Sequence, residues 1–259
     1  ALPICTLKRV REMGYDGVEF YGLHGHSPSE VKDMIDETGL IPISALVPIE
    51  EMLTDPDKVI AGYAEMGCKY IAIPFLVENR RPGTDGFEQT IRDIEMLASV
   101  AKKYGMQMLY HNHDFEFVKI NGEYALDVLY QSISPELLQT EIDTCWVNVA
   151  GENPAEYIRK YIDRTPLVHL KDFVRGTGKK PEKAHDLHGA ESEEKSDSDE
   201  KPFAFRPVGC GVQNFPAILT AAEEAGAEWI IVEQDLPSMG KTSMECADIS
   251  RKYLKSLGI

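Results

Sequence analysis

The sequence predicts an α/β fold, a (β/α)8 barrel of the TIM type that forms a single domain over residues 1–259. Three observations predict it. Short apolar segments alternate with longer amphipathic segments along the chain. Most short segments are apolar on both faces, which is typical of parallel strands covered by helices. The amphipathic segments tend to end at a glycine just before the next apolar segment, and this repetition indicates consecutive βα units.

The apolar segments predict seven strands, each bounded by polar residues or by glycine. They cover residues 17–22, 41–47, 70–75, 106–111, 138–143, 167–172 and 229–235.

The amphipathic segments predict the helices. Segment 27–39 opens with Ser27 and Pro28, a typical helix start, and ends at Gly39. The same pattern predicts helices at residues 6–14, 56–67, 87–105, 153–163 and 214–226.

Seven strands are one fewer than a closed eight-stranded barrel contains. Helix 6–14 ought to follow a strand, so we expect the first strand of the barrel to be missing from this chain. The alternative is that Leu2–Cys5 form a stub of it. An open barrel has two unpaired edges, which a partner chain or a terminal segment would have to cover, so a homo-oligomer is one expectation.

One segment interrupts the alternation. Residues 175–201 contain almost no apolar side chains, and their second half is acidic and rich in serine. Such a composition cannot form a core, and it predicts a mobile acidic loop inserted after the strand at 167–172.

The composition limits the partners. The chain carries 43 acidic residues against 27 basic ones, a net charge of −16, which argues against nucleic acid because phosphate binding needs a basic face. It has no signal peptide and no apolar run long enough to span a membrane. The five cysteines never form a CxxC pair, which favours a reducing compartment. We therefore expect a cytoplasmic protein with no membrane partner.

Polar side chains gather at the ends of several predicted strands. In a βα barrel, the carboxyl ends of the strands and the loops after them form the active site. These positions hold Glu19 and His24, then the stretch LYHNHDFEF (109–117), then Glu141, Asp143, His169, Lys171, Asp172, Glu233 and Asp235.

Carboxylates and an imidazole converging at one site predict one bound divalent cation, because they supply the oxygen and nitrogen donors that Mn²⁺, Mg²⁺, Co²⁺ or Zn²⁺ accept. The expected ligands are Glu116, Asp143, His169 and Glu233, with Mn²⁺ the foremost metal. Glu116 lies five residues beyond His111 and can fall in the loop, in which case His111 or His113 would replace it.

Six stretches together resemble the sugar phosphate isomerase/epimerase family, whose members are xylose-isomerase-like TIM barrels, and the resemblance covers essentially the whole chain. They are GYDGVEFYGLHG (14–25), YHNHDFEF (110–117), EIDTCWV (141–147), VHLKDF (168–173), PVGCGVQNF (207–215) and IIVEQD (230–235). The resemblance implies a carbohydrate substrate and one divalent metal held by Glu, Asp, His and Glu from successive strand ends, matching the four expected ligands.

The sequence departs from the family at two places. Trp146 stands where ketose epimerases carry a histidine, and it would either stack on a sugar or belong to the core. Gly209-Cys210-Gly211 replaces a loop that commonly reads GEG, so an acid is absent there.

The implied chemistry is removal of a proton from a carbon next to a carbonyl, with the metal stabilising the enediolate. Candidate proton-transfer residues are Glu233, Glu116 and His113. Lys171 would donate to the substrate, or pair with an acid as a structural ion. Substrate-binding candidates are His24, His111, Trp146 and Asp172.

Three functions follow from these features. The first is a metal-dependent sugar isomerase or epimerase. The second is a lyase or dehydratase on keto-sugars or inososes, which Trp146 favours because epimerisation needs an acid or base on each face of the substrate. The third is a barrel without activity. No glycine-rich phosphate loop supports a phosphorylated substrate.

Overall fold

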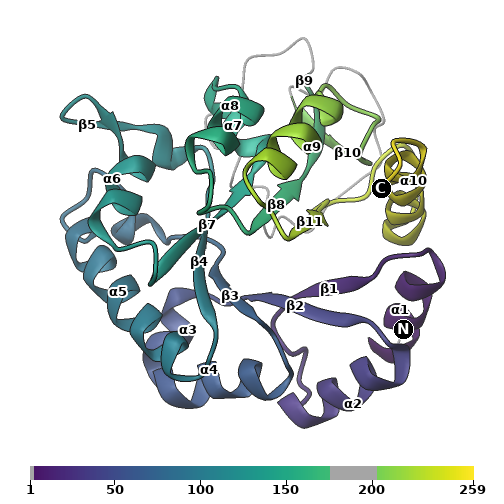
Figure 1. Cartoon of the computed structure of the whole chain (residues 1–259), viewed down its shortest axis with the longest axis horizontal. Coiled ribbons are helices and arrows are strands. Elements are labelled where there is room, and N and C mark those ends of the chain that lie inside the picture. The colour runs from purple at the N-terminus through teal and green to yellow at the C-terminus, as the bar shows by residue number, and fades with distance from the viewer. Residues whose placement is uncertain (1–2, 176–202) are drawn as a thin grey trace.

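The computed structural model describes residues 3–175 and 203–259. A seven-stranded parallel sheet in the order β1-β2-β3-β4-β7-β8-β11 curves into a nearly closed barrel with helices around it (Figure 1). All seven predicted strands are confirmed, with small differences at their ends. The strands are β1 Gly17–Tyr21, β2 Ile41–Leu46, β3 Tyr70–Ile73, β4 Gln107–His111, β7 Leu138–Asp143, β8 Leu167–Leu170 and β11 Trp229–Val232.

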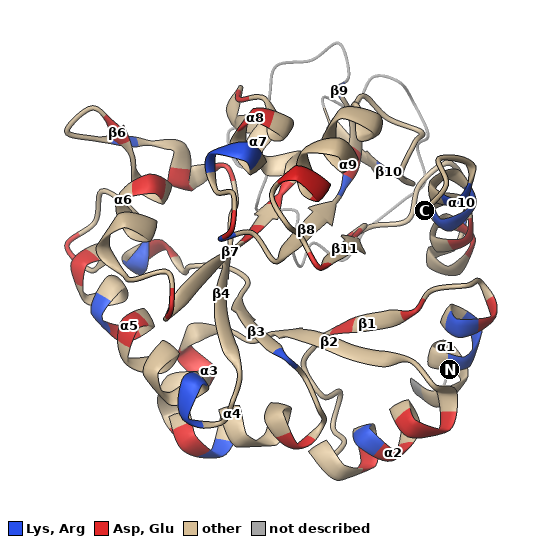
Figure 2. Ribbon diagram, in the orientation of Figure 1, with Lys and Arg blue, Asp and Glu red and all other residues tan. Residues whose placement is uncertain are grey.

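The six predicted helices are also confirmed. They are α1 Pro3–Glu12, α2 Pro28–Thr38, α4 Pro56–Glu65, α5 Phe87–Lys103, α8 Pro154–Lys160 and α9 Phe215–Glu224. Local signals set their ends: Ser27 and Glu30 form a capping box at the start of α2, and Gly39 ends it in the left-handed conformation. Charged residues lie mostly on the outer helices, while the strands are largely uncharged (Figure 2).

The sequence analysis did not predict several further elements. They are α3 Ile49–Thr54, α6 Ala125–Ser132, α7 Thr144–Ala150, α10 Ser243–Ser256, the single-turn helices η1 Glu78–Arg80 and η2 Phe115–Phe117, and the two-residue strands β5 Lys119–Ile120 and β6 Glu123–Tyr124. The helices of the described ranges lack the length and apolar character that crossing a bilayer demands.

The barrel is open between β1 and β11, which are the two edges of the sheet. The alternative that Leu2–Cys5 form a strand stub is wrong for residues 3–5, since α1 begins at Pro3. The ends of the chain still meet: the Tyr15 hydroxyl donates to the Ala247 carbonyl at 2.9 Å, and Arg251 Nε donates to the Gly14 carbonyl at 2.9 Å. The start of β1 is thereby held against α10.

The expected strand at 167–172 is two strands. β8 ends at Leu170, and the chain then leaves the barrel as β9 (Asp172–Arg175), which pairs antiparallel with β10 (Phe203–Arg206). The expected acidic loop at 175–201 lies outside the described residues except for Arg175. A small aromatic core forms beneath this hairpin from Cys145, Trp146, Val149, Phe173, Phe203 and Phe205.

Two further hydrophobic clusters hold the barrel together. The main core lies between the sheet and the helices, and it includes outward-facing strand residues such as Ile71, Met108 and Ile142. Inside the barrel, Ile43, Tyr70 and Leu109 belong to a second cluster. Polar side chains lie above this inner cluster, at the carboxyl ends of the strands.

Candidate metal centre

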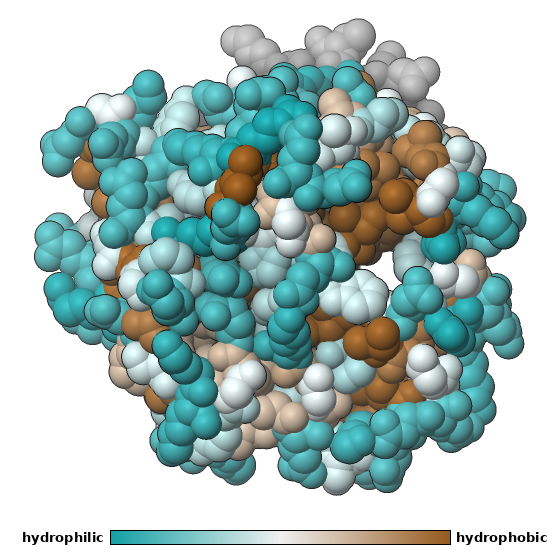
Figure 3. Space-filling model, in the orientation of Figure 1, coloured by the Kyte–Doolittle hydropathy of each residue, from teal (hydrophilic) through white to brown (hydrophobic). Residues whose placement is uncertain are grey.

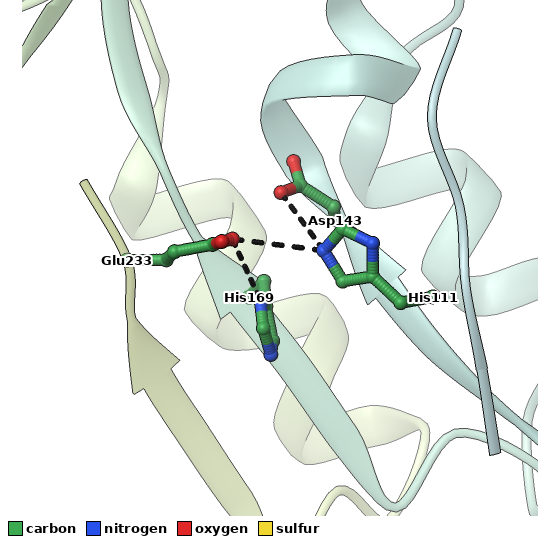
Figure 4. A group of neighbouring side chains, drawn as sticks. All are labelled: His111, Asp143, His169 and Glu233. Carbon is green, nitrogen blue, oxygen red and sulfur yellow. Dashed lines mark hydrogen bonds and ion pairs between the residues drawn. The ribbon is translucent and has the colours of Figure 1, made fainter. Parts of the chain in front are cut away.

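Four side chains converge at the carboxyl ends of β4, β7, β8 and β11. One potential ligand atom from each of His111, Asp143, His169 and Glu233 lies within 4.8 Å of the other three. His111 Nε2 is 3.3 Å from Asp143 Oδ2 and 3.6 Å from Glu233 Oε2, and His169 Nδ1 is 2.8 Å from Glu233 Oε2. Figure 4 shows the four side chains pointing toward one another.

The parallel register produces this convergence. His111 and Asp143 are the last residues of β4 and β7, Asp143 lies opposite His169, and Glu233 directly follows β11. Asn112, which directly follows β4, holds the ends of β4 and β7 together. Its side-chain amide accepts from the Asp143 backbone N–H at 2.9 Å and donates to the Asp143 carbonyl at 3.3 Å. The ligand ends of β4 and β7 are thus tied together by a buried side chain.

The group has the composition of a divalent metal site. Two imidazoles and two carboxylates supply mixed nitrogen and oxygen donors, which suit Zn²⁺ and Mn²⁺. His111 Nε2 and Asp143 Oδ2 are buried, and neither makes a hydrogen bond with any group in the described ranges. Buried polar atoms without hydrogen bonds are costly, and a cation at the centre of the group would satisfy them.

Lys171 and Asp235 complete the charge balance. The Lys171 ammonium is fully buried and lies 3.0 Å from Asp235, 3.2 Å from Glu233 and 3.7 Å from Asp143. Trp146 and Phe205 each present a ring within 5.3 Å of it. Lys171 therefore acts as an ion-pair partner of three acids.

The acids and bases of this centre shift one another's ionisation. Burial lowers the pKa of Lys171, but the charges of Glu233, Asp235 and Asp143 outweigh burial and raise it above its usual value. Burial likewise lowers the pKa of His111, and the neighbouring carboxylates overcome this and raise it to about 9. Burial raises the pKa of Glu233, yet Lys171 and His169 hold it well below its usual value. Without metal, protonated bases neutralise these acids, and a bound cation would displace the histidine protons.

A second group lies directly behind His169. Glu19 on β1 and Glu141 on β7 approach His169 Nε2, the nitrogen opposite the one near Glu233, at 2.9 and 3.3 Å. Burial, strengthened by the charge of Glu19, raises the pKa of Glu141 to about 7. For Glu19 the effect of burial is outweighed by His169, which holds its pKa below the usual value.

A cavity of about 1390 Å³ opens above the centre and continues between β1 and β11. Its polar lining residues include Arg81, His111, His113, Glu233 and Asp235. Hydrophobic side chains gather on both sides of the opening in Figure 3. The cavity lining includes Val18 and Phe20 of β1 and Ile230 and Val232 of β11. The volume exceeds what one sugar needs.

The sequence matches the xylose isomerase-like TIM barrel family over residues 7–257. The chain belongs to this family. An inosose dehydratase of Lacticaseibacillus casei is 29% identical over 173 residues, covering 66% of this chain and 54% of that protein. The chain thus spans about half the length of the curated relatives it matches.

Solved structures agree on the fold of this xylose isomerase-like barrel. A sugar phosphate isomerase/epimerase from Parabacteroides distasonis superposes with a TM-score of 0.73 at 22% identity, covering 98% of this chain and 88% of that one. An IOLI protein with a bound zinc atom gives a TM-score of 0.69 at 15% identity, covering 98% and 91%. The resemblance found in the sequence is thereby confirmed at the level of family and fold.

Within this family fold, three of the four expected ligands lie together, and Glu116 lies apart. The Glu116 carboxylate is fully buried and accepts from the Tyr110 hydroxyl at 2.6 Å and from the His113 backbone N–H at 2.8 Å. His111 occupies the fourth position of the group instead. The reason is the turn after β4: Glu116 is the middle residue of the single-turn helix η2, and its side chain points back to Tyr110 and to the His113 backbone.

Glu116 should make the stability of the protein depend on pH. Burial raises its pKa to about 7, against the lowering effect of the bonds from Tyr110 and His113. The folded state therefore holds a proton that the unfolded state releases near pH 4.5, so the free energy of unfolding falls as pH rises from about 4.5 to about 7. This fall can reach roughly 3 kcal/mol, and we expect it to be absent in Glu116→Gln. Urea denaturation of the parent and the variant at several pH values measures it. An identical pH dependence in the variant would contradict this.

Other expected site residues are distributed as follows. His113 lines the cavity, with its ring centroid 5.1 Å from that of His111. Trp146 is fully buried in the aromatic core, stacked on His113 and Phe203, and does not line the cavity. Of the two expectations for Trp146, the structure therefore agrees with a place in the core and not with stacking on a sugar. His24 is exposed, has a left-handed backbone conformation and lies outside the cavity lining.

Asp172 was expected to contact the substrate, but its carboxylate instead holds a neighbouring loop in place. Its carboxylate accepts from the backbone N–H groups of Phe173, Gly209, Gly211 and Gln213. A Cβ at Gly211 would lie 2.2 Å from Asp172 Oδ1, so the loop can approach the carboxylate closely only because glycine is there. The Gly209-Cys210-Gly211 loop thus forms a tight turn around Asp172.

The sequence analysis named Glu19, Glu141 and Asp235 among the polar residues at strand ends but assigned them no role, and it did not single out Asn112. Two of them carried a signal, since Glu141 and Asp235 lie two residues from Asp143 and Glu233 and so share their face by strand alternation. Glu19 is an acid within the otherwise uncharged strand segment GVEFY. Asn112 had no comparable signal.

Proposed function

We propose that the chain is a lyase that removes water from a keto-polyol of the inosose type, using one divalent cation held by His111, Asp143, His169 and Glu233. The convergence of these four side chains beneath one cavity carries the proposal. The relatedness to an inosose dehydratase supports the substrate class.

The cation would polarise the substrate carbonyl and stabilise the negative charge that develops after proton removal. Mn²⁺ and Zn²⁺ both accept the two imidazoles and two carboxylates of the group. The zinc atom of the structurally similar IOLI protein supports testing both metals.

Two residues that line the cavity would carry out the two proton transfers of the reaction. His113 lines the cavity beside His111, and we assign to it the removal of the proton on the carbon next to the carbonyl. The electron pair of that C–H bond forms a C=C bond, and the C–O bond on the adjacent carbon breaks. Asp235, whose pKa burial raises to about 6, protonates the departing hydroxyl, which leaves as water.

A sugar isomerase or epimerase on the same site is the second candidate. Glu116 points away from the metal group, so it is not placed to act as the second acid or base that epimerisation requires. Asp235 could take that place, because it lines the same cavity as His113. The position of Glu116 thus favours the lyase. Because Asp235 could supply the second acid or base, the experiment below also tests for an isomerase or epimerase.

The test is the fate of an inosose in D₂O with Mn²⁺- or Zn²⁺-loaded protein. We expect mass spectrometry to show the loss of one water, abolished in Asp143→Asn. Deuterium incorporation without loss of water would favour the isomerase or epimerase. If neither change occurs over a panel of keto-polyols and ketoses, both candidates are contradicted and a barrel without activity is favoured.

The cytoplasmic location, the absence of nucleic-acid and membrane partners and the homo-oligomer stay predictions.

A further inference from the structure

The group behind His169 has no place in the proposed proton transfers, yet it is among the most buried polar clusters of the described residues. The side chain of Glu19 is 5% exposed, and those of Glu141 and His169 are 0% exposed. Glu19 Oε1 and both Glu141 oxygens make no hydrogen bond within the described ranges. Two buried carboxylates beside one imidazole are costly unless they serve that imidazole.

His169 stands between two sets of acids. Its Nδ1 lies 2.8 Å from Glu233 Oε2, on the side of the metal group, and its Nε2 lies 2.9 Å from Glu19 Oε2 on the opposite side. A neutral imidazole carries one N–H, and only the other nitrogen can bind a metal. Which nitrogen is protonated therefore decides whether His169 can be a ligand.

We propose that Glu19 and Glu141 are positioning residues that hold the His169 proton on Nε2 and so direct the lone pair of Nδ1 at the cation. The inference rests on the proposed metal centre. Glu19 Oε2 lies 2.9 Å from Nε2 and would accept the Nε2–H, and Glu141 Oε1, on the strand next to β8, lies 3.3 Å from the same nitrogen. Carboxylates that accept from a metal-bound histidine are a general means of fixing its orientation.

The arrangement links distant parts of the chain. Glu19 lies on the edge strand β1, and His169 lies on β8, next to the opposite edge strand β11. The contact between them therefore crosses the open side of the barrel. Glu141 precedes the ligand Asp143 by two residues, so one strand supplies both a ligand and a support.

The test uses Co²⁺, which reports its coordination through its visible spectrum. We expect Glu19→Leu and Glu141→Leu to weaken Co²⁺ binding by about 10- to 100-fold each and to change the spectrum. Glu19→Gln keeps an acceptor oxygen and the volume, so it should retain more affinity than Glu19→Leu. Asp127→Asn is the matched control: it alters a buried carboxylate that bonds to Tyr157 and Tyr161, far from His169 in the fold, and should bind Co²⁺ like the parent.

A second measurement needs no substitution. Long-range ¹H–¹⁵N NMR of the Zn²⁺-loaded protein should show the His169 proton on Nε2, and a proton on Nδ1 would overturn the inference. Unchanged Co²⁺ affinity and spectrum in both leucine variants would also overturn it. The inference would also be overturned if each chain bound two Co²⁺ ions and Glu141→Gln lost one of them, because Glu19 and Glu141 would then be metal ligands themselves. A parent protein that binds no Co²⁺ would instead refute the metal centre, and with it the proposed function.

Discussion

Replacing Asp143 by asparagine should weaken Mn²⁺ binding by more than about 100-fold, since changes to residues that merely support a ligand already cost 10- to 100-fold. The fold should survive. Asp143 Oδ1 caps α7 by accepting from the backbone N–H groups of Cys145 and Trp146, at 2.7 and 3.1 Å, and an asparagine oxygen can keep these bonds. Oδ2, which faces His111, is the atom whose charge is lost.

Titration calorimetry with Mn²⁺ and elemental analysis of the purified protein measure this effect. Glu116→Gln is the matched control, because it also removes a buried carboxylate that follows a ligand-bearing strand, yet it lies outside the metal group. We expect its Mn²⁺ affinity to stay within about threefold of the parent, well below the cost of altering a supporting residue. Full metal occupancy in Asp143→Asn, or its loss in Glu116→Gln, would refute the ligand set.

Replacing Lys171 by methionine should destabilise the metal-free protein by about 3–5 kcal/mol, the usual cost of removing one partner from a buried ion pair. The ammonium lies within 3.7 Å of three acids, which would then repel one another in a buried site. A bound cation would replace part of the missing positive charge. The increase in stability on adding Mn²⁺ should therefore be larger in the variant than in the parent.

Urea denaturation with and without Mn²⁺ measures both quantities. Lys252→Met is the control, because Lys252 makes an exposed i,i+4 ion pair with Asp248, and we expect it to change the free energy of unfolding by less than about 1 kcal/mol. A metal-free Lys171→Met protein as stable as the parent would show that Lys171 does not balance the charge of the site.

The sequence by itself determined the barrel and the edge of the sheet that carries the chemistry. Alternation of apolar and amphipathic segments located seven strands and six helices, because hydrophobic periodicity and end signals are local. Asp143, His169 and Glu233 were predictable as a group for a related reason. Each stands at the carboxyl end of a strand, and consecutive parallel strands bring these ends to one edge.

Only the tertiary structure decided which fourth side chain joins them and what supports them. Glu116 and His111 are five residues apart and both suit a metal, and the turn through η2 sends Glu116 beneath the loop and leaves His111 in the group. Glu19 meets His169 across 150 positions of sequence. Trp146 enters a core completed by Phe203 from β10. Such contacts depend on how strands far apart in the chain pack around the barrel, and no local pattern in the sequence encodes that packing.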